Sequence, residues 1–136
     1  MDYKKAKKIS NEIRSQISDL TEVGSLARKE NKINDFDYIT MRNIEDVVDD
    51  IHKLDKSKLK KIFGNQEVEI DLWKADNPDE FMHLQVMRTI NKGKNIYYRK
   101  LARSNGYTLT DKYLKIDGKK YYVASEEQLM IYLNLI

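Results

Sequence analysis

The chain has 136 residues, enough for one compact unit, or two subdomains, but too few for several independent modules. Its 40% hydrophobic and 35% charged residues, with a net charge of +3, are typical of a folded globular protein and argue against disorder. It has no cysteine and no apolar run of about 18 residues, so we expect no disulfide, no cysteine zinc site and no membrane span.

The N-terminal third predicts helices and short strands in alternation. Apolar residues recur at spacings of three and four along one face of a first helix: Ala6, Ile9, Ile13, Ile17 and Leu20. A short strand from Thr21 should lead through a turn at Gly24-Ser25 into a brief helix. Asn43 is the predicted N-cap of a longer helix, whose apolar face carries Ile44, Val47, Val48, Ile51 and Leu54.

Two carboxylates stand side by side on the strand expected over residues 33–41. Successive strand side chains point to opposite faces, so Asp35 and Asp37 share one face. The segment LKKIFGNQEVEIDLW predicts a hairpin around Gly64-Asn65. Three acids alternate on one face of this hairpin: Glu67, Glu69 and Asp71. We therefore expect a cluster of acids on one side of a sheet.

The C-terminal part predicts a helix towards residue 90, a second helix over 94–104, a hairpin over 112–123 and a last helix. Four signals mark these elements: Asn77-Pro78 with Glu80 at the first helix, Asn105-Gly106 after the second, Asp117-Gly118 in the hairpin, and Ser125 with Gln128 at the last helix. Together the elements predict an α+β fold.

Positive charge gathers in the C-terminal half. Residues 87–120 carry ten Lys or Arg and only two acids, Asp111 and Asp117, whereas residues 45–86 carry eleven acids and six bases. Tyrosines at 97, 98, 107 and 113 stand among these cations, and such a segment attracts a phosphate backbone. A solvated, lysine-rich surface is the other interpretation of the same pattern.

The N-terminal half combines residues suited to phosphate with residues suited to metal ions. Gly24 would let backbone amides approach a phosphate closely, Ser25 would add a hydroxyl donor, and Arg28 a charge-assisted contact to a triphosphate. Mg²⁺, or Mn²⁺ in its place, prefers carboxylate oxygens, and three carboxylates are available: Asp35, Asp37 and Asp71. The combination predicts phosphoryl transfer.

Gly24-Ser25 followed ten residues later by Asp35-x-Asp37 resembles the signature of the beta-type nucleotidyltransferase superfamily. The segment TINKGKNIYYRKLARSNGYTLTDKYLKIDGKKYYVASEEQLMIYLNL is similar to the C-terminal subdomain of family X DNA polymerases, including its N-x3-R-x6-GY pattern. The chain looks most like the reduced viral members, which lack a lyase domain. The resemblance implies a palm with a small mixed sheet over residues 1–80 and a nucleotide- and template-binding subdomain over 81–136.

Residue roles follow from this resemblance by position. The three aspartates match the family's catalytic metal ligands. Four residues are assigned to the incoming nucleotide: Gly24, Ser25, Arg28 and Asn95, the last at the minor-groove edge. Arg99 matches an arginine that contacts the template strand, and Lys100 and Arg103 are expected as further DNA contacts. A surface pair on a basic helix is the alternative interpretation of Asn95 and Arg99.

The chain departs from the family pattern at two positions. Residues 87–91 (MRTIN) stand where the family has an aromatic pair and a Thr-Gly-Ser turn against the nucleotide sugar. Arg88 thus stands in place of an aromatic side chain. We expect Arg88 to contact the nucleotide, and the protein to discriminate only weakly against ribonucleotides. Glu69 stands where the family often has arginine, so acids face one another. His52 and His83 are interpreted as solvent or interface histidines without a catalytic role.

The resemblance implies template-directed DNA synthesis for short gap filling in repair, by a monomer whose partners are DNA and dNTP, without a membrane. We expect a cytoplasmic location, in a host cell or a virion if the chain is viral. The alternative is an untemplated nucleotidyltransferase acting on RNA, a protein or a small molecule, which would not need the basic C-terminal segment. An inactive nucleic-acid-binding protein is a third interpretation, and the three aspartates argue against it.

Overall fold

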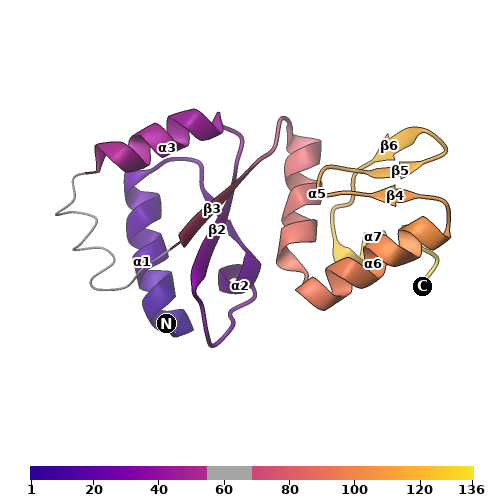
Figure 1. Cartoon of the computed structure of the whole chain (residues 1–136), viewed down its shortest axis with the longest axis horizontal. Coiled ribbons are helices and arrows are strands. Elements are labelled where there is room, and N and C mark those ends of the chain that lie inside the picture. The colour runs from indigo at the N-terminus through magenta and orange to yellow at the C-terminus, as the bar shows by residue number, and fades with distance from the viewer. Residues whose placement is uncertain (55–68) are drawn as a thin grey trace. The chain divides into compact units, whose positions relative to one another are not determined.

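The computed structural model describes residues 1–54 and 69–136 (Figure 1). Within these ranges the chain is a mixed α+β protein with six helices and two three-stranded sheets. It divides into two compact units, Met1–Lys74 and Ala75–Ile136. The boundary expected at residue 80 falls inside the helix α5 (Pro78–Thr89). No helix in the described ranges is long and apolar enough to cross a membrane.

The first unit is built around a mixed sheet with the strand order β1-β2-β3. Its described elements are α1 (Tyr3–Gln16), β1 (Thr21–Val23), α2 (Gly24–Ala27), β2 (Asp35–Thr40), α3 (Ile44–Lys53) and β3 (Glu69–Lys74). Strand β1 is antiparallel to β2, whereas β3 is parallel to β2. The central strand β2 is therefore paired along both of its edges.

One face of this sheet packs into the core of the first unit. Phe36 and Tyr38 of β2 are fully buried and cluster with Val47 of α3 and with the apolar face of α1. The prediction is confirmed for Ala6, Ile9 and Ile13, which are buried on α1. Ile17 and Leu20 are buried too, but they lie beyond the end of the helix at Gln16. Because strand side chains alternate, Asp35 and Asp37 must point to the opposite face of the sheet.

For the first unit, one local expectation is wrong, one is confirmed in position only, and one lies outside the described residues. No turn separates β1 from the brief helix, because α2 begins at Gly24 itself. Asn43 occupies the N-cap position of α3 but does not cap it with its side chain, which instead accepts a hydrogen bond of 3.0 Å from Nζ of Lys74. The hairpin turn predicted at Gly64-Asn65 falls among residues that are not described.

The second unit contains α5, α6 (Lys92–Ser104), β4 (Thr108–Leu109), β5 (Leu114–Ile116), β6 (Lys119–Tyr121) and α7 (Glu126–Tyr132). The three strands form an antiparallel sheet, of which the two-residue strand β4 was not predicted. Both predicted helix caps are confirmed: Asn77 accepts from the Glu80 amide at 2.9 Å, and Ser125 accepts from the Gln128 amide at 3.1 Å. Helix α6 begins two residues earlier than expected, because Asn91 caps it.

His83 is a buried core residue, so its interpretation as a solvent or interface histidine is wrong. Its Nδ1 accepts a hydrogen bond from the Val123 amide at 3.2 Å, and Nε2 lies 2.9 Å from the carbonyl oxygen of Thr110. Burial lowers the pKa of the imidazole below its usual value, which favours the neutral ring that these two partners require. The ring thus joins α5 to two loops of the second unit.

Candidate functional site

The acid cluster lies on the face of the first sheet opposite the core. In the parallel register of β2 and β3, Asp37 is directly opposite Asp71, and Asp35 is opposite Glu69. Carboxylate oxygens of Asp35, Glu69 and Asp71 lie within 4.8 Å of one another. Asp37 interacts with Asp71 through a side-chain hydrogen bond. Asp71 is therefore the member that links Asp37 to the other two acids.

This crowding changes the protonation of Asp37. Burial raises the pKa of its carboxyl group from 3.8 to about 6, and the charge of Asp71, the hydrogen bond with Asp71 and the charge of Asp35 add to the effect. The positive charge of Arg28 acts in the opposite direction. A cluster of this kind resists full ionisation in the absence of a cation.

Gly24 is held against this cluster by its backbone. Its φ of +68° lies in the left-handed region, and a Cβ at this position would come within 3.0 Å of Cγ of Asp37. The glycine of the Gly24-Ser25 pair and the second aspartate of the Asp-x-Asp pair are thus in direct spatial contact. Only glycine fits here without displacing the carboxylate, and the half-buried Ser25 follows immediately.

Arg28 lies at the C-terminal end of α2, close enough to Asp37 to lower the pKa of that carboxyl group. Its Nε donates a hydrogen bond of 2.9 Å to Oε1 of Glu30. Its side chain is 26% exposed, so an anion from solvent can reach it. A triphosphate that binds Arg28 would compete with Glu30 for the guanidinium group.

The donor set fits a hard divalent cation. All members of the cluster offer carboxylate oxygens, which Mg²⁺ and Mn²⁺ accept as ligands. The raised pKa of Asp37 is consistent with a cation site, because a bound positive charge would offset the repulsion from Asp71 and Asp35 that adds to the effect of burial. Glu69 was expected to face the aspartates, and the register of β2 and β3 sets it opposite Asp35.

We expect Mg²⁺ to raise the melting temperature of the protein, and to do so more at about pH 8 than at about pH 5. The folded state keeps a proton on Asp37 up to about pH 6, whereas the unfolded chain loses it near 3.8. Stability from this group is therefore present at low pH and is lost as the pH rises through that window. Differential scanning fluorimetry with Mg²⁺ and with EDTA measures both effects.

Asp37→Asn is the matched variant for this measurement. Asparagine keeps the shape of the side chain without the charge, so it should melt higher than the wild type in EDTA above about pH 6. It should also gain less from Mg²⁺. If the melting temperature of the wild type is the same with Mg²⁺ as with EDTA at both pH values, that result would count against a metal site.

Three predicted nucleic-acid contacts meet in one hydrogen-bond network in the second unit. Asn95 is buried at 9% exposure, and its Nδ2 donates to the Met87 carbonyl at 2.8 Å. Its Oδ1 accepts from Nε of Arg99 at 2.6 Å. Arg88 and Arg99 both donate to Oδ1 of Asp111, Arg88 at 3.0 Å. The role of Asp111 in this network was not predicted from the sequence, where it stood out only as one of two acids in a basic segment.

Lys100 and Arg103 differ from these residues, because they are exposed on the outer surface of α6. Ile96 and Tyr97 are 44% and 52% exposed. Ile96 precedes Lys100 by four residues and Arg103 by seven, and Tyr97 precedes Lys100 by three, so each is a neighbour of a cation on the helix surface. The sequence of α6 contains no acid. Exposed aromatic and cationic side chains on one helix face suit stacking on bases and contact with phosphates.

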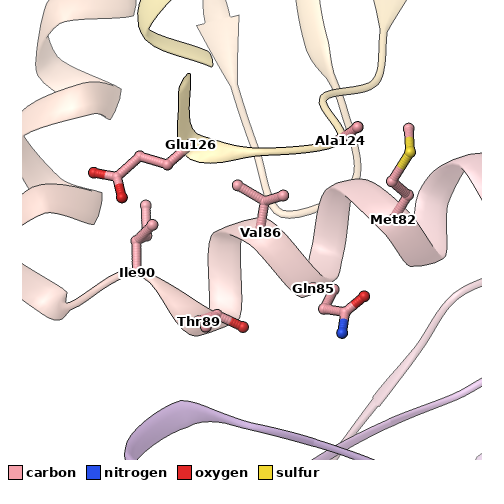
Figure 2. Close-up of a pocket in the computed structure, with 7 residues that line it drawn as sticks. All are labelled: Met82, Gln85, Val86, Thr89, Ile90, Ala124 and Glu126. Atoms are coloured by element: carbon pink, nitrogen blue, oxygen red, sulfur yellow. The ribbon is translucent and has the colours of Figure 1, made fainter. Parts of the chain in front are cut away.

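A groove of about 450 Å³ lies along α5 in the second unit (Figure 2). In Figure 2, Val86 and Ile90 point towards the segment that carries Ala124 and Glu126. None of the residues that the sequence assigned to the nucleotide, the metal or the DNA lines this groove. The groove is therefore distinct from both groups of candidate residues.

A scan of the chain against protein-family models gives no match, and a search of the curated proteins gives none. The resemblance seen in the sequence therefore stays a prediction.

Proposed function

We propose that the chain is a nucleotidyltransferase resembling the family X DNA polymerases, which adds a nucleotide to the 3′ hydroxyl of a DNA primer. The acid cluster is the observation that supports this proposal most strongly. Asp37 and Asp71 face each other across adjacent strands, next to Asp35 and on the side of the sheet away from the core. In this proposal the first unit is the palm of the enzyme.

The chemistry follows from the residues around the cluster. A divalent cation held by Asp35, Asp37 and Asp71 would neutralise charge on the phosphoryl group and lower the pKa of the attacking hydroxyl. The carboxylate of Asp71 would accept the hydroxyl proton. The primer oxygen then forms a bond to the α-phosphorus as the bond to pyrophosphate breaks. Ser25 and Arg28 would hold the triphosphate in line for this attack.

The second unit supports a nucleic acid as the acceptor. Lys100, Arg103 and Tyr97 form an exposed face on α6, with Asn95 and Arg99 on the adjacent, less exposed side of the helix. An untemplated transferase that modifies a protein or a small molecule has no need of such a face. We therefore infer that DNA and a dNTP are the partners, and that base pairing with a template selects the nucleotide.

Offering each dNTP separately on a duplex with a single-nucleotide gap tests template dependence. We expect Mg²⁺-dependent addition of the nucleotide complementary to the template base, and little addition to the same primer without a template. Asp37→Asn, purified in parallel, controls for contaminating polymerases. Comparable addition of all four nucleotides would favour the untemplated transferase. Absence of addition to every DNA or RNA acceptor would contradict the proposal.

Arg88 is expected to weaken discrimination against ribonucleotides. It replaces an aromatic side chain of the family pattern, and its guanidinium group can donate a hydrogen bond to a ribose hydroxyl. We predict that kcat/KM for dCTP exceeds that for rCTP by less than about a hundredfold, and that Arg88→Phe raises this ratio by about tenfold. Arg103→Gln, on the exposed face of α6, is the control and should leave the ratio unchanged. Strong rejection of rCTP by the wild type would refute this.

A further inference from the structure

Asp111 lies between two arginines that the proposed function assigns to nucleic acid or nucleotide. Arg88 comes from the end of α5 and Arg99 from the middle of α6, and both donate to the same oxygen, Oδ1 of Asp111. One carboxylate thus accepts hydrogen bonds from two guanidinium groups. Within residues 87–120 the only other acid is Asp117, in the hairpin turn.

Asp111 is fixed by its own loop, not by the arginines. The neighbouring Thr110 accepts hydrogen bonds at Oγ1 from the amides of Lys112 and Tyr113, both at 3.2 Å. The Thr110 amide donates to the Tyr113 carbonyl at 2.9 Å. This turn holds the backbone of residue 111 whether or not its side chain is paired. When a competing anion arrives, the long arginine side chains are the groups that can move.

The three charged side chains are also reachable from solvent. Arg88, Arg99 and Asp111 have side chains that are 27%, 34% and 31% exposed. A phosphate can therefore approach either guanidinium without local unfolding. Arg99 keeps a second anchor in Asn95, through its Nε, while its terminal nitrogen pairs with Asp111. Exchange of one partner would thus leave Arg99 oriented by the other.

We propose that Asp111 is a positioning residue, resting on the function proposed above, that holds Arg88 and Arg99 back from nucleic-acid phosphates until a phosphate replaces its carboxylate. The carboxylate and the phosphate compete for the same nitrogen donors. Binding of nucleic acid must then break the pairs with Asp111, and this cost lowers the affinity. In the unbound protein the same pairs keep the two arginine side chains oriented. Removal of the negative charge should tighten binding, because that competition is gone.

Fluorescence anisotropy of a labelled gapped duplex over a series of salt concentrations measures this competition with the full chain. Without Mg²⁺ or dNTP, we expect Asp111→Asn to bind about five- to tenfold more tightly than the wild type. The slope of log Kd against log salt should steepen by about one, as one more phosphate contact forms. Asp111→Glu keeps the charge and should bind within about twofold of the wild type.

Asp117→Asn is the matched control for net charge. Asp117 lies in the hairpin turn with φ of 50°, a conformation that asparagine also adopts, so the substitution removes one charge without strain. It should change Kd by less than about twofold. In an Arg99→Gln background, Asp111→Asn should have a smaller effect, because only Arg88 is left to be released.

Several results would overturn the proposal. These are weaker or unchanged binding by Asp111→Asn, an equal gain from Asp117→Asn, or no binding of the duplex by any variant. An Asp111→Asn chain that does not fold would also overturn it, because exchange requires a fold that survives loss of these pairs. Binding is measured without Mg²⁺ or dNTP and so does not depend on nucleotide transfer. If Kd changes as expected but the wild-type protein transfers no nucleotide, the transferase proposal alone is contradicted.

Discussion

Asp71→Asn is expected to lower the rate of nucleotide transfer by about a thousandfold or more, with little change in the affinity for DNA. Asp71 is the acid that both faces Asp37 across the strands and shares a cluster with Asp35 and Glu69. An amide at this position can neither accept the hydroxyl proton nor balance the charge of a cation as a carboxylate does. Single-turnover extension of a gapped duplex measures the loss.

The controls for Asp71→Asn separate chemistry from folding. Removal of its charge should lower the pKa of Asp37 towards its ordinary value, so the variant should be at least as stable as the wild type in EDTA. Asp49→Asn makes the same chemical change on the exposed surface of α3 and should remain fully active. Activity of Asp71→Asn within about tenfold of the wild type would contradict the assignment.

Gly24→Ala is expected to damage both stability and transfer. Alanine must adopt a φ near the +68° of Gly24, and its methyl group would overlap the carboxylate of Asp37. Left-handed backbone and displacement of a half-buried acid together predict a loss of about 1–3 kcal/mol in the free energy of unfolding. Transfer should fall by about a hundredfold, because Asp37 moves out of the cluster.

Gly93→Ala is the matched control for this substitution. Gly93 lies in the first turn of α6, where an added Cβ would meet only Oδ1 of Asn91, at 3.4 Å. Alanine there should leave stability unchanged or raise it by about 0.5–1 kcal/mol, because it favours helix. Urea unfolding followed by circular dichroism compares the two. A Gly24→Ala protein as stable and as active as the wild type would show that the contact with Asp37 is unimportant.

Local features of the fold were predictable because each depends on a few neighbouring residues. The apolar spacing of α1 reports the core face of a helix. The caps at Asn77 and Ser125 depend on a side chain and an amide three positions later. Asp117-Gly118 supplies two residues with positive φ, as the hairpin turn requires.

Features that depend on distant residues were not predictable from local patterns. Asn43 was expected to cap α3, but Lys74, far along the chain, binds its side chain instead. His83 had no neighbour in the sequence that indicated its burial between two loops. Asp111 joins Arg88 and Arg99 only because the second unit folds them together.

In the candidate site, too, local features were predictable from the sequence and long-range contacts were not. Strand alternation predicted that Asp35 and Asp37 share a face. The register that sets Asp71 opposite Asp37 depends on pairing between β2 and β3 across a long stretch of chain. The contact of Gly24 with Asp37 likewise needs the three-dimensional fold, although the Gly-Ser and Asp-x-Asp spacing indicated that both belong to one site.

Addition of dCMP opposite a template dG in a single-nucleotide gap is the reaction that the acid cluster must catalyse if the proposed function is right. Wild-type protein and Asp37→Asn are expressed and purified side by side and assayed in a single turnover with Mg²⁺. We expect rapid addition of one nucleotide by the wild type, none with EDTA, and none by Asp37→Asn. Equal addition by the two proteins, or none by the wild type with either Mg²⁺ or Mn²⁺, would contradict the proposed function.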